Sequence, residues 1–132
     1  MTEIKSLHPK QAWSVLDTDP SAVLVDVRDR IEAAFVGYPI GSVNIPWKEA
    51  PSWKPNPDFL GEVRQRFPNP ATPLLLMCRS GQRSLDACKA LAEAGYNDLT
   101  NIEEGFEGPL DERKHRGALG GWRAHGLPWE QS

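Results

Sequence analysis

Uninterrupted hydrophobic runs at two places in the chain predict strands that are buried on both faces. The run 22–27 is apolar except for Asp26 and does not alternate with polar residues, and the run Leu74–Met77 is wholly apolar. Such runs are typical of parallel strands that helices cover on both sides. Shorter hydrophobic stretches predict two further strands, at 42–45 and Leu99–Ile102.

Apolar residues recur at helical spacing between these runs and predict the helices. Pro9 favours a helix start, and Gly95 favours a helix end. Helices are expected at 9–16, 31–35, 58–67 and 83–94, with a fixed proline-rich loop at 46–57. Because strands and helices alternate, the sequence predicts an α/β fold with a central parallel sheet flanked by helices. In such folds, functional sites lie at the carboxyl ends of strands.

Size and charge limit the classes of function. The chain has 132 residues, 39% of them hydrophobic, which points to one domain spanning 1–132. A net charge of −3 gives no general attraction for nucleic acid or an acidic membrane. No apolar run approaches the length of a membrane span or signal peptide. Cys78 and Cys88 lie on either side of one helix start, which disfavours a disulfide. We expect a cytoplasmic protein that binds neither nucleic acid nor membrane.

The segment Cys78–Ser84, Cys-Arg-Ser-Gly-Gln-Arg-Ser, carries the chemistry. It follows a buried strand and leads into a helix, so some of its backbone N–H groups have no partner within that helix. Together with the helix macrodipole they favour an anion such as a thiolate. Arg79 and Arg83 add positive charge, and Gly81 allows the positive φ of a tight curl. We therefore expect Cys78 to be a nucleophile.

The spacing Cys-x-x-Gly-x-Arg, from Cys78 to Arg83, resembles the active loop of the rhodanese-like sulfurtransferase family. The likeness extends through most of the chain. It includes Asp-Val-Arg at 26–28, the segment 37–46 (Gly-Tyr-Pro-Ile-Gly-Ser-Val-Asn-Ile-Pro) and the closing segment 120–129. The resemblance implies a single-domain rhodanese-like fold that needs neither a cofactor nor a metal.

Two features depart from that family's pattern. Tyr38 stands where the family usually has histidine, and a charged insert, 111–117, precedes the closing segment. Neither changes the nucleophile. The insert is expected to be a solvated surface loop, and the alternative is that it reaches over the site and adds cationic charge.

The resemblance implies a two-step sulfur transfer. Cys78 would attack the outer sulfur of a small anionic donor such as thiosulfate. It would then carry that sulfur as a persulfide to a thiophilic acceptor such as cyanide, a small thiol or a protein thiol. Asp26 and Ser84 are expected to support the site. The residues expected to bind substrate are Arg79, Ser80, Gly81, Gln82 and Arg83, with Arg28 at the neighbouring strand end.

The length of the loop favours sulfur over phosphate. Cys78 and Arg83 are five positions apart, whereas the related phosphatase loop places its Cys and Arg six apart. The shorter ring has one fewer amide and fits a single sulfur atom better than a tetrahedral oxyanion. A phosphatase or arsenate reductase on the same scaffold is the first rival, and a non-catalytic sulfur carrier or sensor is the second.

Several polar residues near the loop have two interpretations. Asp26 either holds Arg83 or a loop amide in place, or caps the turn at a strand end. Arg28 and Glu32 have the spacing of a local helical ion pair. Cys88 lies on the apolar face of its expected helix, which favours packing over a role as a resolving thiol.

Aromatic residues and histidines complete the candidates. Trp47, Trp53 or Trp122 are hypothesised to form a rim that shields the persulfide from water. The three histidines and two cysteines show no close ligand spacing, so no metal site is expected.

Overall fold

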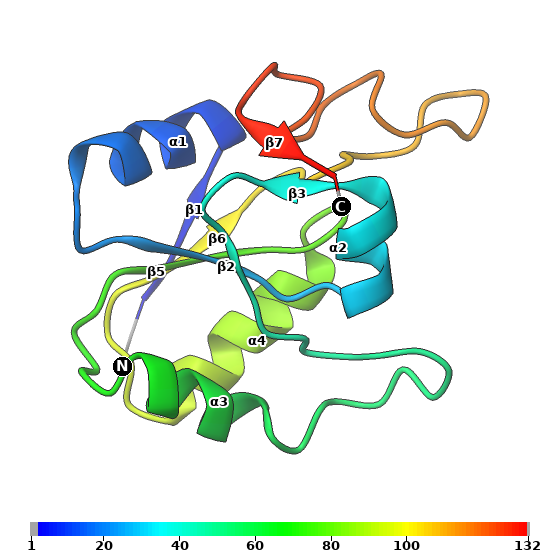
Figure 1. Ribbon diagram of the computed structural model, residues 1–132. Helices are drawn as coiled ribbons and strands as arrows, with labels where there is room; N and C mark the ends of the chain where they lie inside the picture. The colour runs from blue at the N-terminus through cyan, green and yellow to red at the C-terminus, as the bar shows by residue number, and fades with distance from the viewer. Residues whose placement is uncertain (1–2, 132) are drawn as a thin grey trace.

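The structure is a computed structural model that describes residues 3–131. Its centre is a five-stranded parallel sheet in the order β1-β6-β5-β2-β4, and helices cover both faces (Figure 1). A two-stranded antiparallel ribbon joins β3 to β7. The strands are β1 (Ile4–Leu7), β2 (Val23–Asp26), β3 (Tyr38–Pro39), β4 (Val43–Asn44), β5 (Leu74–Met77), β6 (Leu99–Ile102) and β7 (Trp129–Glu130). The helices are α1 (Pro9–Thr18), α2 (Arg30–Val36), α3 (Phe59–Arg66) and α4 (Gln82–Glu93).

The predicted α/β architecture is confirmed. Strands β5 and β6 have the predicted bounds, and β2 and β4 lie inside the predicted runs. Each helix end agrees with the prediction to within two residues. The sheet pairs are all parallel, and β5 lies between β2 and β6. This central position explains why β5 is hydrophobic throughout.

The sheet separates two hydrophobic layers. On one face, Leu74 and Leu76 of β5 pack in a cluster with residues of α3 and α4. On the other face, Leu75 and Met77 pack with α1 and with Trp122 from the C-terminal segment. Successive residues of β5 serve opposite layers because side chains alternate along a strand. The strand that leads to Cys78 is therefore fixed from both sides.

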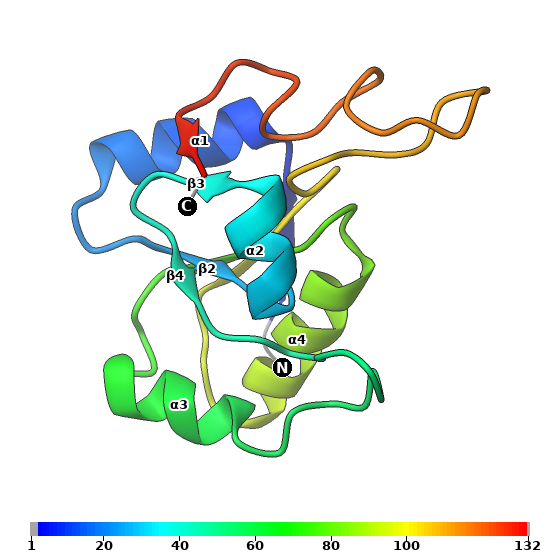
Figure 2. The same ribbon diagram turned by 45° about the vertical axis from the view of Figure 1, so that its right-hand side comes forward.

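Three strands lie outside the expectations from sequence. Strand β1 is at the sheet edge, where Lys5 and Ser6 face solvent and interrupt any hydrophobic run. Strands β3 and β7 pair over two residues each, Tyr38 with Glu130 and Pro39 with Trp129. Figure 2 shows this ribbon close to α1 and α2. Contacts between such distant segments leave no local pattern in the sequence.

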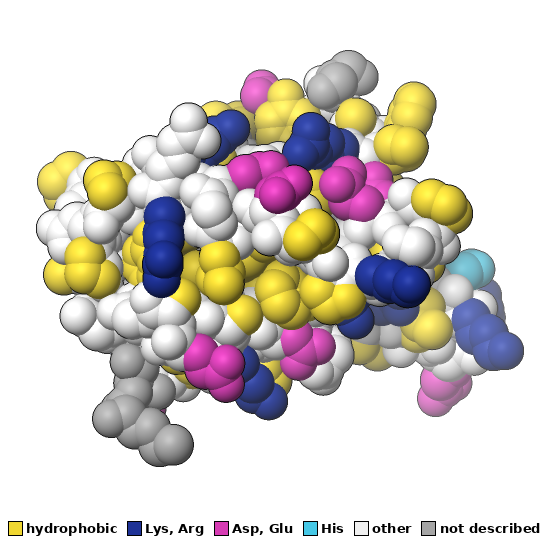
Figure 3. Space-filling model, turned by 90° about the horizontal axis from the view of Figure 1, so that it is seen from below, with side chains coloured by type: hydrophobic (Ala, Val, Ile, Leu, Met, Phe, Trp, Pro, Cys, Tyr) yellow, Lys and Arg dark blue, Asp and Glu magenta, His cyan; other side chains and the backbone are white. Residues whose placement is uncertain are grey.

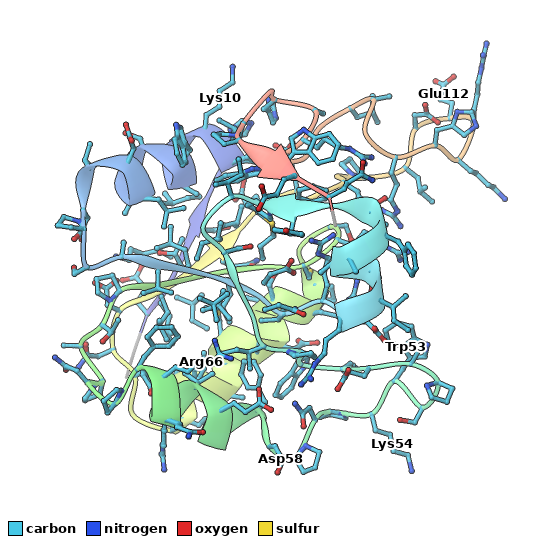
Figure 4. All side chains as sticks on the ribbon, in the orientation of Figure 1. Lys10, Trp53, Lys54, Asp58, Arg66 and Glu112 are labelled. Atoms are coloured by element: carbon cyan, nitrogen blue, oxygen red, sulfur yellow. The ribbon has the colours of Figure 1, made fainter. Side chains whose placement is uncertain are left out.

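The insert 111–117 is an exposed loop that extends from the body of the molecule, with Glu112 in its outer part (Figure 4). Its tip closes on itself, because the Asp111 carboxylate accepts hydrogen bonds from the backbone N–H groups of Arg113 and His115 at 2.9 and 2.8 Å. This geometry agrees with the expected solvated loop.

The face that carries α3 and the 46–57 loop mixes charges of both signs. Lys and Arg side chains lie singly among Asp and Glu rather than as a continuous basic surface (Figure 3). Within residues 3–131, no helix combines the length and hydrophobicity that crossing a membrane requires.

Candidate active site

Cys78 follows β5 directly and opens the loop into α4. Its residue surface is 1% exposed. The backbone N–H of Gly81 donates to the Cys78 Sγ at 3.0 Å. Gly81 precedes the first residue of α4 and has φ 119°, a conformation that side chains with a Cβ rarely adopt. The loop therefore curls back on the sulfur at the position where glycine stands.

The first turn of α4 adds further donors at the same end. The helix begins at Gln82, and its first bond to a preceding residue runs from Leu85 N to Gly81 O at 3.2 Å. The N–H groups of Gln82, Arg83 and Ser84 thus have no intrahelical acceptor, and the macrodipole adds positive potential. The exposed Gln82 side chain donates from its Nε2 to the Asp86 Oδ1 at 3.1 Å.

The carbonyl groups at the start of the loop are tied back by the segment that follows β6. Phe106 N–H donates to Cys78 O at 2.8 Å, and Glu107 N–H donates to Arg79 O at 3.0 Å. Gly105 lies so close behind the loop that a Cβ on it would overlap the Cys78 carbonyl oxygen. Because carbonyl oxygens carry partial negative charge, pairing them with these N–H donors offsets part of the negative potential beside an anionic sulfur.

Ser84 and Asn101 support the loop from the side of β6. The Ser84 Oγ lies 3.4 Å from the Cys78 Sγ, 3.1 Å from Gly81 O and 2.5 Å from the Asn101 Oδ1. The Asn101 Nδ2 also donates to Gly81 O at 3.2 Å. Both side chains are buried, which strengthens the network. Sequence reasoning missed Asn101, and the available signal was the polar pair Thr100-Asn101 in a buried strand.

Arg83 binds Glu32 of α2 and not Asp26. The two contacts, Nη1 to Oε1 at 2.6 Å and Nη2 to Oε2 at 2.9 Å, form a bidentate ion pair. The guanidinium also lies 5.7 Å from the centre of the Trp53 ring. Burial acts to lower the pKa of Arg83, but the bond to Glu32 outweighs it and the pKa is raised.

A cleft of about 470 Å³ opens beside the loop. Trp53 is 45% exposed and lies on the 46–57 loop, on the side of α2 (Figure 4). Arg79 is exposed, and Arg83 reaches the same cleft already paired. The wall therefore offers a small anion one exposed guanidinium, one paired guanidinium and an indole. The lining residues are Glu32, Val36, Trp53, Arg79, Arg83 and Glu107.

Asp26 and Arg28 form a fully buried ion pair beneath the loop, which corrects two expectations. The Arg28 Nε donates to the Asp26 Oδ1 at 2.8 Å, and the Arg28 Nη2 donates to the Oδ2 at 2.6 Å and to Gly37 O at 2.7 Å. Arg28 also stacks on Phe106, 4.5 Å from the ring centre. Its guanidinium has no exposed surface, so it does not reach a substrate in the cleft. Arg28 also does not pair with Glu32, because Glu32 binds Arg83.

The remaining candidates are divided between the cleft and the core. Of the three tryptophans expected at the rim, Trp53 lines the cleft, Trp47 packs against Phe59 and Trp122 is fully buried. Cys88 is also fully buried. Burial, followed by the nearby Cys78, raises the pKa of the Cys88 thiol to about 12. This environment fits a packing role for Cys88.

A second polar cluster lies away from the cleft. The His8 Nε2 is 3.1 Å from the Glu104 Oε2, and the His125 Nε2 is 3.1 Å from the Glu104 Oε1. Burial acts to raise the pKa of Glu104, but the hydrogen bonds from Gly121 N–H and His125 outweigh it and the pKa is lowered. The sequence suggested no such grouping, because the two histidines are at opposite ends of the chain.

Comparisons with known proteins agree with the fold. A family profile described as Rhodanese-like domain matches residues 8–111. The crystal structure of Rv0390 from Mycobacterium tuberculosis superposes with a TM-score of 0.89 at 42% identity, covering 99% of this chain and 100% of that one.

Similar sequences include proteins with and without an assigned activity. An uncharacterized protein of Rickettsia conorii is 30% identical over 132 residues, covering 96% of this chain and 98% of its own. The thiosulfate:glutathione sulfurtransferase of Saccharomyces cerevisiae is 29% identical over 110 residues, covering 82% of this chain and 69% of its own.

Proposed function

Because this chain belongs to the rhodanese-like domain family, we propose that it is a sulfurtransferase in which Cys78 carries a sulfane sulfur as a persulfide. The observation that carries the proposal is the Gly81 N–H, 3.0 Å from the Cys78 Sγ, at the N-terminus of α4. A helix N-terminus favours a negatively charged sulfur. The likeness to a sulfurtransferase that acts on thiosulfate and glutathione supports the same chemistry.

The first step loads the cysteine. The Cys78 thiolate attacks the outer sulfur of thiosulfate, a new S–S bond forms, the sulfur–sulfur bond of thiosulfate breaks, and sulfite leaves with the bonding electron pair. The terminal sulfur then lies about 2.05 Å beyond the Sγ. There it would approach the N–H groups of the α4 first turn, which would stabilise its negative charge.

The second step regenerates the Cys78 thiolate. Cyanide or an acceptor thiolate attacks the terminal sulfur, and the persulfide bond breaks with its electron pair going to the Sγ. The product is thiocyanate or an acceptor persulfide, and Cys78 is again a thiolate. No external oxidant or reductant is needed, because the sulfane sulfur keeps its oxidation state.

The charged residues of the cleft have different roles in this proposal. Arg79 is exposed beside the loop and would bind the donor anion. Arg83 is held by Glu32 at 2.6 Å, so it would add positive potential from a fixed position. Trp53 borders the same cleft and would limit access of water to the loaded sulfur.

The spacing of the loop supports sulfur transfer over phosphate hydrolysis. The Gly81 N–H contacts the Sγ three positions after Cys78, and Arg83 follows five positions after Cys78. A phosphoryl group would need room for its three non-bridging oxygens in the same ring. The proposal therefore expects thiosulfate turnover and no hydrolysis of an aryl phosphate.

The deciding experiment is an intact-mass measurement of the purified protein after thiosulfate treatment. We expect the addition of one sulfur atom, its removal by cyanide, and steady thiocyanate formation. Cys78→Ser should show none of these three results, whereas the matched variant Cys88→Ser should behave like the wild type. An unchanged mass in the wild type would contradict the persulfide. A mass gain without turnover would indicate a sulfur carrier, and release of phosphate from an aryl phosphate would indicate the phosphatase alternative.

A further inference from the structure

We propose that His8, Glu104 and His125 form a binding site for a divalent transition-metal ion, and that this ion is Zn²⁺. Each residue offers one donor atom, and the three donor atoms all lie within 4.8 Å of one another. The site is separate from the cleft beside Cys78, and the inference does not rest on the proposed sulfur chemistry.

The parallel sheet brings the first two ligands together. His8 directly follows β1, and Glu104 follows β6 by two residues. These strands are neighbours with Leu7 opposite Ile102, and Glu103 N–H donates to Leu7 O at 2.8 Å. The carboxyl ends of adjacent parallel strands meet at one edge of a sheet, which is where such folds place functional groups.

The third ligand comes from the C-terminal segment. His125 N–H donates to Gly121 O at 3.1 Å, which closes a turn over the end of β6. The ring of His125 meets that of His8 edge to face, with ring centres 4.5 Å apart. Three segments that are distant in the sequence therefore direct one donor each to the same point.

The distances fit a zinc site. Zn²⁺ binds imidazole nitrogen and carboxylate oxygen at about 2.0–2.2 Å, so two ligand atoms on one tetrahedral ion lie about 3.3 Å apart. Each histidine Nε2 is already 3.1 Å from an oxygen of Glu104. Because the side chains of His8, Glu104 and His125 are 37%, 24% and 24% exposed, they have room to adjust and to admit water as a fourth ligand.

The Glu104 carboxylate is held in place by the backbone around it. Gly121 N–H donates to its Oε1 at 2.8 Å. A Cβ on Gly120 would lie within bonding distance of the same oxygen, so only glycine permits this approach. Glu104 itself has φ 69°, which is uncommon for a residue with a side chain. Such support of a ligand by neighbouring hydrogen bonds is typical of metal sites.

The donor set selects the class of ion. Two imidazoles and one carboxylate suit zinc and neighbouring transition metals, whereas Mg²⁺ and Ca²⁺ prefer oxygen donors alone. A single carboxylate between two imidazoles also matches the three-ligand pattern that leaves one zinc position open.

His8 supplies a local signature of binding. Its Nδ1 accepts the Lys10 N–H at 3.3 Å in the α1 cap, so the proton of the neutral ring lies on the Nε2. Coordination through Nε2 moves this proton to Nδ1, which then no longer accepts from Lys10. The Lys10 amide resonance should therefore shift when the ion binds.

The test is titration of the full chain with Zn²⁺ alone, in competition with a chromophoric chelator. Because cysteine thiolate also binds zinc, the parent protein carries Cys78→Ser. We expect one bound ion, a higher melting temperature with Zn²⁺ than with EDTA, and a shift of the Lys10 amide. Adding His125→Ala or Glu104→Gln should weaken binding at least about tenfold. Adding His115→Ala, a histidine of the exposed 111–117 loop, should leave it unchanged.

Three outcomes would overturn the site. They are no zinc binding by the parent, equal affinity in the parent and the His125→Ala protein, and a loss with His115→Ala as large as that with His125→Ala. If His125→Ala lowers the melting temperature in EDTA, His8→Ala serves as the second ligand variant. Equal affinity in that protein would overturn the site as well.

Discussion

Arg83 and Glu32 form a bidentate ion pair that connects the first turn of α4 to α2 at the wall of the cleft, with N–O distances of 2.6 and 2.9 Å. The side chains are 18% and 21% exposed. The pair fixes the arginine within the positive end of the helix, and the carboxylate offsets part of its charge. The electrostatic potential at the Cys78 loop therefore depends on the charges of both Arg83 and Glu32.

The two members of this pair should have opposite effects on reactions of Cys78. Arg83→Ala removes positive charge, so we expect alkylation by iodoacetamide near neutral pH to slow by about two- to tenfold. Glu32→Gln removes negative charge while keeping the shape, so reaction with thiosulfate should become faster. Pseudo-first-order rates for the two variants measure this, and an unchanged alkylation rate in Arg83→Ala would contradict the electrostatic role.

Gly105→Ala should displace the backbone of the cysteine loop at Cys78 and Arg79. A Cβ there would overlap Cys78 O, so the loop must move. We expect a loss of about 1–3 kcal/mol in the free energy of unfolding and reduced sulfur loading. Gly41→Ala is the matched control, because Gly41 also has positive φ but no atom within 4 Å of its Cβ position. Urea unfolding and intact mass compare the two. Equal sulfur loading in both variants would show that the close packing of Gly105 behind the loop is not needed.

Asp26→Asn should destabilise the fold because it leaves the buried Arg28 charge without its partner. We expect a loss of about 3–5 kcal/mol in the free energy of unfolding. Glu112→Gln, in the exposed insert, should change it by less than about 0.5 kcal/mol. Urea denaturation of both variants checks this, and similar midpoints would refute the importance of the pair.

Cys88 should resist alkylation in the folded protein. Its pKa is raised to about 12, so the unreactive thiol form persists at every pH below that value and thiolate accumulates only as the pH approaches it. At pH 8, iodoacetamide should modify Cys78 alone, and both cysteines after unfolding in urea. Peptide mass mapping separates the sites. Comparable labelling of both in the native protein would show that the helix opens.

The signals that predict β2, β4, β5, β6 and the cysteine loop are local. Leu74–Met77 is a hydrophobic run, and Gly81 marks the curl that follows it within the same few residues. The ion pairs could not be predicted in the same way. Asp26 and Arg28 are two residues apart, yet which arginine each carboxylate binds depends on how α2 packs against α4.

Long-range contacts account for the other omissions. Nothing in the sequence distinguishes Asn101 from other polar residues. Its role depends on the position of β6, which brings the Asn101 Nδ2 to 3.2 Å from the Gly81 carbonyl oxygen. The pairing of Tyr38 with Glu130 and the approach of His8 to His125 depend on where the C-terminal segment folds. Sequence patterns report an element's own periodicity and contain no information about such distant partners.

The hydrogen bonds that hold the carbonyl groups of Cys78 and Arg79 can form only after the segment that follows β6 has been synthesised. Their donors, Phe106 and Glu107, come well after α4, and Trp122 behind them comes later still. A nascent chain that has emerged only through α4 thus contains the reactive thiol but lacks the groups that orient its loop. On the ribosome, the sulfur would gain its finished surroundings among the last steps of folding.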